Sequence, residues 1–184
     1  MRLRNLLPIL ALTAAPAFAQ DAHFGLQAGI SMPQSDAKDF VDSKMGLGLG
    51  LNVGIEFTGG HVLRPRLDFT RTKGTLNELG VSFDNTVTTT TLGMDYNYFV
   101  SGKATEGFYL IAGLGFAKTK VEASVPGFGS ASDSKNALAI ALGAGFQFTP
   151  MVGADLRYTT THPDFGGTDK FKNDAINLGV TFRF

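Results

Sequence analysis

Cysteine and tryptophan are absent from this 184-residue sequence, whereas glycine occurs 23 times and phenylalanine 16 times. Without cysteine the chain forms no disulfide, so its stability must come from backbone pairing and packing. After residue 19 no segment approaches the roughly 18 consecutive apolar residues that mark a membrane-spanning helix. These absences exclude a disulfide framework and a helical membrane protein, and they leave the composition rich in glycine and phenylalanine to be explained.

The chain also lacks an excess of positive charge. It has 16 basic and 16 acidic residues, and Arg2 and Arg4 lie in the segment 1–19. Without that segment, 14 basic residues face 16 acidic ones, which is a net charge of about −2. Nucleic acid is a poor partner for such a balance, because binding to phosphates depends on a basic surface. We therefore expect no nucleic-acid function.

The first 19 residues have the pattern of a secretory signal peptide. Their apolar run is interrupted by proline and is too short to span a bilayer as a helix. We expect a signal peptide over residues 1–19 and one exported domain over residues 20–184. The pattern consists of a basic start, an apolar run and the small residues of a cleavage point, which are Arg2 and Arg4, residues 6–18, and Ala17 and Ala19.

Apolar residues alternate with small or polar ones in eight segments of the exported part. In residues 46–51, for example, glycine and leucine alternate strictly. A period of two is that of a strand whose two faces differ, and no helix has it. The predicted strands are 22–32, 45–57, 62–71, 86–98, 108–117, 136–148, 152–159 and 174–184.

The connections between these strands alternate in length, because four are long and polar and the three between them are short. Short periplasmic turns, long extracellular loops, an even strand number and outward apolar faces are features of bacterial outer-membrane barrels. We therefore predict an all-β fold, an eight-stranded antiparallel up-and-down transmembrane β-barrel. Aromatic residues should gather at the strand ends, and both termini should lie in the periplasm. The long connections are 33–44, 72–86, 118–135 and 161–173.

The last predicted strand carries the most specific motif. Its apolar residues alternate up to Phe182 and Phe184, and stretches that alternate with glycine, such as 112–115, recur elsewhere. With these features the chain resembles the small outer-membrane barrels typified by OmpX and the transmembrane domain of OmpA. The resemblance implies a monomer in the bacterial outer membrane, surrounded by lipid and lipopolysaccharide. It also implies that Phe182 and Phe184 form the signal read by the barrel-insertion machinery.

The polar faces of the strands carry a balanced set of charges, four acidic and four basic, whereas the apolar faces carry almost none. The lumen of an eight-stranded barrel is only wide enough for side chains, so we expect these charges to pair there and plug it. A soluble barrel of the lipocalin or streptavidin kind would need the opposite arrangement, and its lumen would be overfilled by apolar groups. The expected network is Glu56, Arg64, Arg66, Asp68, Asp95, Asp155, Arg157 and Arg183.

Local pairing within this network follows from the short turn at residues 58–60. The turn places Glu56 opposite or diagonal to Arg64, and the simplest register of the next pair of strands places Asp95 near Arg66. Pro65 cannot donate a ladder hydrogen bond, so a bulge or local irregularity is expected there.

Three functions are compatible with such a barrel. We favour a structural or surface-interaction protein whose loops contact an extracellular partner that the sequence does not name. The second is a narrow pore for ions or small solutes, and the third is a lipid-modifying enzyme of the outer membrane. The apolar loop residues that would contact the partner are Leu76, Leu79, Val81, Phe83, Val125, Pro126, Phe128, Phe165 and Phe171.

Residues for catalysis or cofactor binding are poorly represented. His23, His61 and His162 fall at different levels of the predicted barrel, and a nucleophile would need both a base and an orienting group within reach. The aspartates of the connection 33–44 lack the glycine and terminal glutamate of a calcium-binding loop. We therefore expect no catalytic residue, no cofactor and no metal site.

Overall fold

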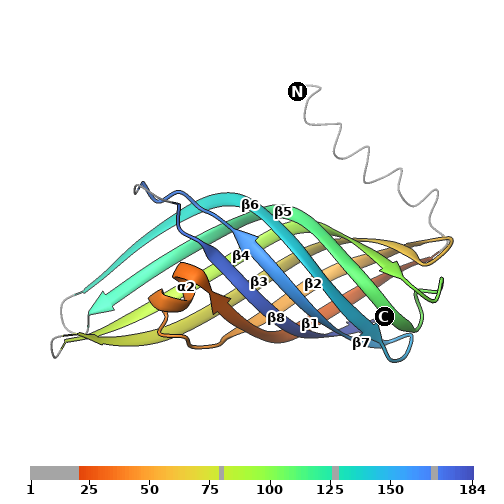
Figure 1. The fold of residues 1–184 in the computed structure, drawn as a ribbon, viewed down its shortest axis with the longest axis horizontal. Coiled ribbons are helices and arrows are strands. Elements are labelled where there is room, and N and C mark those ends of the chain that lie inside the picture. The colour runs from red at the N-terminus through yellow and green to blue at the C-terminus, as the bar shows by residue number, and fades with distance from the viewer. Residues whose placement is uncertain (1–20, 79–80, 126–128, 167–169) are drawn as a thin grey trace, which may run out of the picture.

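The computed structural model describes residues 21–78, 81–125, 129–166 and 170–184. In this part of the chain eight strands form a closed antiparallel barrel in the order of the sequence, as Figure 1 shows, so the predicted fold class is confirmed. The expected signal peptide and its cleavage site at Ala17 and Ala19 lie outside the described residues. The strands are β1 (Asp21–Gln34), β2 (Gly46–Phe57), β3 (His61–Glu78), β4 (Val81–Phe99), β5 (Gly107–Val125), β6 (Gly129–Gln147), β7 (Val152–Thr161) and β8 (Asn173–Arg183).

The strands are tilted, as the register of the ladder shows. A path through paired residues leaves β1 at Asp21, crosses every strand and returns to β1 at Ser31, ten residues further along. Such a stagger tilts the strands of a barrel by about 40° to its axis. The path runs through Asp21, Glu56, Val62, Asn97, Ile111, Gly143, Arg157, Asn177 and Ser31.

The predicted faces of the strands are those observed. Leu49 and Leu51 on β2 are 64% and 55% exposed. Asn52, on the opposite face of the strand, is 9% exposed and points into the barrel. An apolar face on the outside and a polar face on the inside is the arrangement for a barrel surrounded by lipid. The outer face is therefore apolar, as the interior of a soluble barrel would be.

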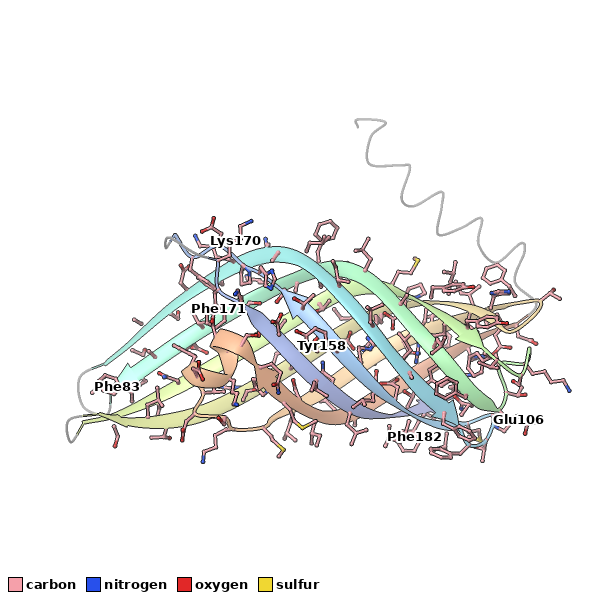
Figure 2. The ribbon with its side chains drawn as sticks, in the orientation of Figure 1. Phe83, Glu106, Tyr158, Lys170, Phe171 and Phe182 are labelled. Atoms are coloured by element: carbon pink, nitrogen blue, oxygen red, sulfur yellow. The ribbon has the colours of Figure 1, made fainter. Side chains whose placement is uncertain are left out.

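The two ends of the barrel differ. One end, here called the turn end, carries the short connections and the C-terminus, and Figure 2 shows Glu106 and Phe182 there. The other end, the hairpin end, carries the β3–β4 and β5–β6 connections, with Phe83 near its tip (Figure 2). Exposed aromatic side chains form a belt toward the turn end and a smaller set on the other side of the aliphatic band, as expected for two membrane interfaces. They are Phe24, Tyr96, Tyr98, Phe108, Phe146, Phe148, Phe182 and Phe184, and Phe69, Phe116 and Tyr158.

Two of the predicted loops are wrong. Residues 72–86 and 118–135 continue the strands β3 to β6 instead of forming irregular connections. Polar residues there suggested loops, but both segments also contain threonine and valine, which favour strands because their branched side chains fit a pleated surface. The result is a four-stranded protruding sheet that extends past the other strands in Figure 1. It comprises residues 72–78, 81–87, 119–125 and 129–138.

A short helix, α2 (Ser35–Phe40), occupies the mouth of the barrel at the hairpin end (Figure 1). It lies in the predicted connection 33–44, whose Ala37, Phe40 and Val41 have helical spacing. Ala37 and Val41 are almost fully buried. In the described residues no helix is long and apolar enough to cross a membrane.

Hydrogen bonds fasten α2 to strands on both sides of the mouth. Ser35 donates to Asp174 of β8 at 2.8 Å, and Asp36 accepts from the Lys172 backbone N–H at 2.8 Å. From the opposite side, the Asn85 amide of β4 donates to the Phe40 carbonyl at 2.8 Å. Because these bonds come from two distant strands, α2 spans the opening.

Pro65 does not cause the expected bulge. The β2–β3 register is the same on both sides of it, from Asn52 opposite Arg66 to Ile55 opposite Leu63. Only the pairing between these positions is interrupted, because proline has no N–H to donate. The irregularity is therefore a local gap in the ladder and not an inserted residue.

Gly74 allows α2 to approach the barrel, because a Cβ at this position would lie 2.0 Å from the Val41 carbonyl oxygen. We expect Gly74→Ala to displace α2 and to accelerate tryptic cleavage at Lys38 and Lys44 in the folded barrel. Gly48→Ala is the matched control, because the nearest atom to its Cβ would be a Thr70 methyl carbon, at 3.2 Å. Equal cleavage rates for the two variants would contradict this packing.

Candidate functional site

An apolar layer closes the lumen near the turn end. Phe99 and Tyr109 stack with their ring centroids 4.7 Å apart, and Ala104, from the turn between β4 and β5, folds in against them. The layer comprises Val62, Phe99, Ala104, Tyr109 and Ile111, all at most 5% exposed. This layer was not predicted, although Phe108 to Ile111 are apolar on both faces of the strand. Such a pattern indicates a strand end whose side chains are buried in the lumen on one face and contact lipid on the other.

A small charged group lies beside this layer. Glu56 is 2.7 Å from His23 Nε2 and 3.7 Å from Arg183 Nη1. Arg183 also donates to the Ala104 carbonyl at 2.7 Å and lies over the Phe99 ring, 5.5 Å from its centroid. The register puts Val62 opposite Glu56 and so leaves Arg64 in the predicted diagonal position, but among the described residues no ion pair joins Glu56 to Arg64.

Asp95 is the centre of a second, larger group in the middle of the lumen. Its Oδ2 accepts hydrogen bonds from Arg66 Nη1 at 2.8 Å and from Arg157 Nη2 at 2.5 Å. Asp95 is 2% exposed and Arg157 is 4% exposed. Hydrogen bonds between charged groups are the stronger kind, and two guanidinium groups compensate a carboxylate that burial would otherwise destabilise.

The remaining charges extend this group across the barrel. Arg66 also binds Asp68, its neighbour on β3, through a pair of hydrogen bonds. Gln27 of β1 accepts from Arg66 at 3.1 Å and donates to Asp155 of β7 at 2.8 Å. Arg64 lies 3.9 Å from Asp155. Gln27 was not predicted, although it stands on the polar face of the first strand.

The register differs from the expected one by two residues in this region. Asp95 lies opposite Arg64, and Gly93 lies opposite Arg66. Asp95 nevertheless reaches Arg66, because the guanidinium stands at the end of a long side chain. The eight predicted charges thus form two groups: Glu56 and Arg183 near the turn end, and the other six in the middle.

Inward-facing glycines make room for the central group. A Cβ at Gly113 would lie 2.3 Å from Asp95 Oδ1, and one at Gly50 would lie 2.5 Å from Asp68 Oδ1. A Cβ at Gly179 would lie 2.4 Å from Gln27 Nε2. The glycines therefore do not leave an open channel at this level, because the polar side chains opposite them occupy the space.

A chamber of about 120 Å³ lies between the central charges and α2. Arg66, Asp95 and Arg157 line one side, and Ala37 of α2 lines the other. The Asn173 amide nitrogen lies 3.0 to 3.2 Å from the hydroxyls of Thr89, Thr119 and Thr161, which share its two N–H donors. Within the described residues, α2, the central charges and the apolar layer thus form three successive barriers along the lumen.

Ser35, Thr160, His162 and Asp174 come together at the hairpin end and include the residue types of a hydrolase site. Asp174 accepts from Thr160 Oγ1 at 2.5 Å, and His162 Nε2 lies 3.2 Å from that oxygen and 3.5 Å from Asp174. In a catalytic triad the carboxylate orients the other ring nitrogen of the histidine. The cluster lacks that geometry and instead holds α2 through Ser35.

The other two histidines lie elsewhere. His23 contacts Glu56 near the turn end, and His61 Nδ1 lies 2.5 Å from the Tyr96 hydroxyl on the outer face. In the part of the chain that the structure describes, no group of three or more histidine or acidic residues is arranged to hold a metal ion.

The family follows from a comparison with known sequences. The family model described as outer membrane protein beta-barrel domain matches residues 6–184. The chain belongs to this family. A comparison with curated proteins gives no significant match.

Solved structures share the fold of this outer-membrane barrel. The Yersinia pestis attachment invasion locus protein, Ail, is 22% identical, with a TM-score of 0.59 over 89% of this chain and 97% of Ail. Neisserial surface protein A is 17% identical, with a TM-score of 0.57 over 89% and 97% of the two chains. The N-terminal barrel domain of Pseudomonas aeruginosa OprF is 15% identical, with a TM-score of 0.55 over 90% and 99%.

Family membership identifies the surroundings of the barrel. The protein is an integral β-barrel of the bacterial outer membrane, so lipid contacts the exposed apolar residues of the outer face. The charges and hydroxyls described above face the lumen and are shielded from that lipid by the strands.

Asp95→Ala should destabilise the barrel, because Arg66 and Arg157 lose the buried carboxylate that they share. We expect a loss of about 3 to 5 kcal/mol in the free energy of unfolding, as for other broken buried ion pairs. Arg66→Ala should cost less, since Asp95 keeps Arg157. Urea titration in detergent micelles followed by circular dichroism measures the loss.

Glu122→Ala is the control for Asp95→Ala. It removes the half-exposed pair in which Glu122 accepts from Lys120 at 2.9 Å, and such pairs contribute less than about 1 kcal/mol. Similar unfolding midpoints for Asp95→Ala and Glu122→Ala would show that the central charges do not hold the barrel together.

Proposed function

We propose that this barrel is a surface-interaction protein that binds an extracellular protein through the protruding sheet. In this proposal the turn end and both termini lie in the periplasm, and the hairpin end faces outward. The barrel serves as a monomeric anchor and carries out no catalysis. A closed ring of strands leaves no transmembrane edge that needs a second copy.

The free edges of the protruding sheet are the observation that carries the proposal. Among the described residues, β6 pairs with β5 alone from Gly129 to Leu138, because its pairing with β7 begins at Ala139. Unpaired backbone N–H and C=O groups along an edge are a template for an added strand. Asp133 and Lys135 on this edge are exposed, and charges there discourage unselective pairing.

An apolar patch on the sheet would give such a partner side-chain contacts. Leu76 pairs with Phe83 across β3 and β4, and both are half-buried, as is Val125. These are three of the predicted contact residues. Leu79, Pro126 and Phe128, and the side chain of Val81, lie outside the described residues.

Phe165 and Phe171, two further predicted contact residues, lie beside α2. Phe171 packs edge-on against Phe40 of α2 at 6.3 Å and against Phe165 at 5.8 Å. These two residues therefore help to hold α2 in the mouth.

The names of two relatives support a surface role. Ail is named for attachment and invasion, and its structure has also been determined with the heparin analogue sucrose octasulfate. Neisserial surface protein A is named for its place at the surface. The three barriers in the lumen favour this role over a pore.

Shortening the β5–β6 hairpin tests the proposal. Replacing Val121–Asp133 by Asn-Gly joins Lys120 to Ser134, which already pair, by a two-residue turn suited to a hairpin. Cells with the unmodified barrel should bind at least one protein of a panel of immobilised serum and extracellular-matrix proteins, and the shortened variant should lose that binding. Full binding by the shortened variant, or no binding beyond that of cells without the barrel, would contradict the proposal.

Cysteine labelling tests the orientation separately, because the chain has no cysteine of its own. Ser132 and Thr105 are exposed at the hairpin end and the turn end, respectively. A membrane-impermeant maleimide should label Ser132→Cys on intact cells and Thr105→Cys only after the outer membrane is opened. The reverse pattern would place the protruding sheet in the periplasm.

A further inference from the structure

Residues 129–138 form the free edge of β6. They pair with β5 on one side, and among the described residues no other backbone hydrogen bond joins them to the chain. The opposite edge of the protruding sheet is less accessible, because Val41 lies against Gly74 of β3 and Gly46 lies against Thr72. A strand added to this sheet therefore has more room at β6.

Two opposite charges share one face of this edge. Asp133 and Lys135 are two residues apart, so their side chains lie on the same side of the strand. Lys135 Nζ lies 4.0 Å from Asp133 Oδ2, and the two side chains are 44% and 56% exposed. An exposed pair at such a distance contributes little to stability, so both charges are available to a partner.

Asp133 also protects the edge. Its Oδ1 accepts a hydrogen bond from the Ser134 backbone N–H at 2.7 Å. Charged side chains that cover an edge discourage pairing with an arbitrary segment. A partner that brings a basic side chain to Asp133 gives the carboxylate another bond and releases the Ser134 N–H. The charge of the partner therefore affects how readily this edge pairs.

Antiparallel pairing converts the two charges into a sequence order. β6 already pairs in this way with β5, and antiparallel ladders place residues directly opposite each other. An added antiparallel strand passes Lys135 first and Asp133 two residues later. Opposite charges in such cross-strand pairs stabilise a sheet, and like charges destabilise it. The favoured strand thus has an acidic residue opposite Lys135 and a basic residue opposite Asp133.

Ala131 and Ala137 flank the two charges on the same face of β6. Alanine extends only a short distance from the sheet, so the partner residues opposite these two positions have room for larger apolar side chains. The whole pattern in the partner is apolar, acidic, basic and apolar at every second position.

We propose that the β6 edge selects an extended segment of an extracellular protein in which an acidic residue stands two positions before a basic one. The proposal rests on the proposed function and specifies the chemistry of the partner at the same edge. Residues 133–135 have this order themselves, but a second copy on the same cell is not the occupant. All β6 strands on one cell run from the hairpin end toward the membrane, so neighbouring copies cannot pair antiparallel.

Two synthetic peptides with blocked ends test the order of charges. One is Thr-Val-Thr-Glu-Thr-Lys-Thr-Val-Thr, and the other exchanges Glu and Lys, so the two have the same composition and net charge. Fluorescence anisotropy of labelled peptide, titrated with the purified folded barrel in detergent, measures the dissociation constants. The first peptide should bind about tenfold more tightly, because the exchange turns two attractive cross-strand pairs into repulsive ones.

The double substitution Asp133→Lys and Lys135→Asp should reverse this preference, because it exchanges the two charges of the edge and keeps the net charge. Gel mobility before and after heating verifies that the variant is folded. The matched control is Lys103→Glu with Glu106→Lys, which exchanges two exposed charges at the turn end. This control should keep the preference of the unmodified barrel.

Three results would overturn the proposal. The first is no binding of either peptide below about 1 mM, a limit that corresponds to a very weak complex. The second is a preference that the exchange at Asp133 and Lys135 leaves unchanged. The third is clumping of cells that carry the barrel and its loss in Lys135→Asp, because a second copy on a facing cell would then occupy the edge.

The peptide assay and the tests of the proposed function fail independently. Peptides that bind without regard to charge order leave intact a binding to cells that is lost when the β5–β6 hairpin is shortened. Conversely, a preference that reverses with the exchanged charges stands even if no protein of the serum and matrix panel binds.

Discussion

Backbone groups in a bilayer have no water to bond to, so every N–H and C=O that crosses the hydrocarbon must be satisfied by the protein itself. Closure of the sheet between β1 and β8 meets this requirement, and the other features depend on it. A ring of eight strands fixes a lumen of side-chain width. The stagger of ten residues then decides which inward residues meet, which is why Asp95 of β4 contacts Arg157 of β7.

A closed ring confines the chemistry of this chain to three places: the lumen, the outer face and the hairpin end. The lumen is filled by paired charges, an apolar layer and α2, so its polar groups stabilise the barrel from within. The exposed apolar residues of the outer face contact lipid. Among the described residues, the protruding sheet presents unpaired backbone at the hairpin end, and these are the groups that the proposed partner would bind.

The period of two in the sequence was sufficient to predict the eight strands, their faces and the eight inward charges, because it is a local property. Partners of those charges could not be predicted in full, since they depend on register. A shift of two residues in the β3–β4 register put Asp95 opposite Arg64. Glu56 contacts His23 and Arg183, which come from strands that the local pattern does not place beside it. The strands beyond Arg71 and before Asn136 were missed because their threonines, serines and lysines resemble a loop in composition. Helix α2 was missed because its one apolar turn, Ala37 to Val41, is stable only through contacts with distant strands.

Conductance of the purified, folded barrel in planar lipid bilayers tests the closed lumen most directly. Three barriers in series predict no steady conductance above that of the bare bilayer. They predict the same for Gly74→Ala, in which α2 is displaced but the central charges and the layer around Phe99 and Tyr109 remain. A stable, ohmic open level in the unmodified protein would contradict this account and make the barrel a pore.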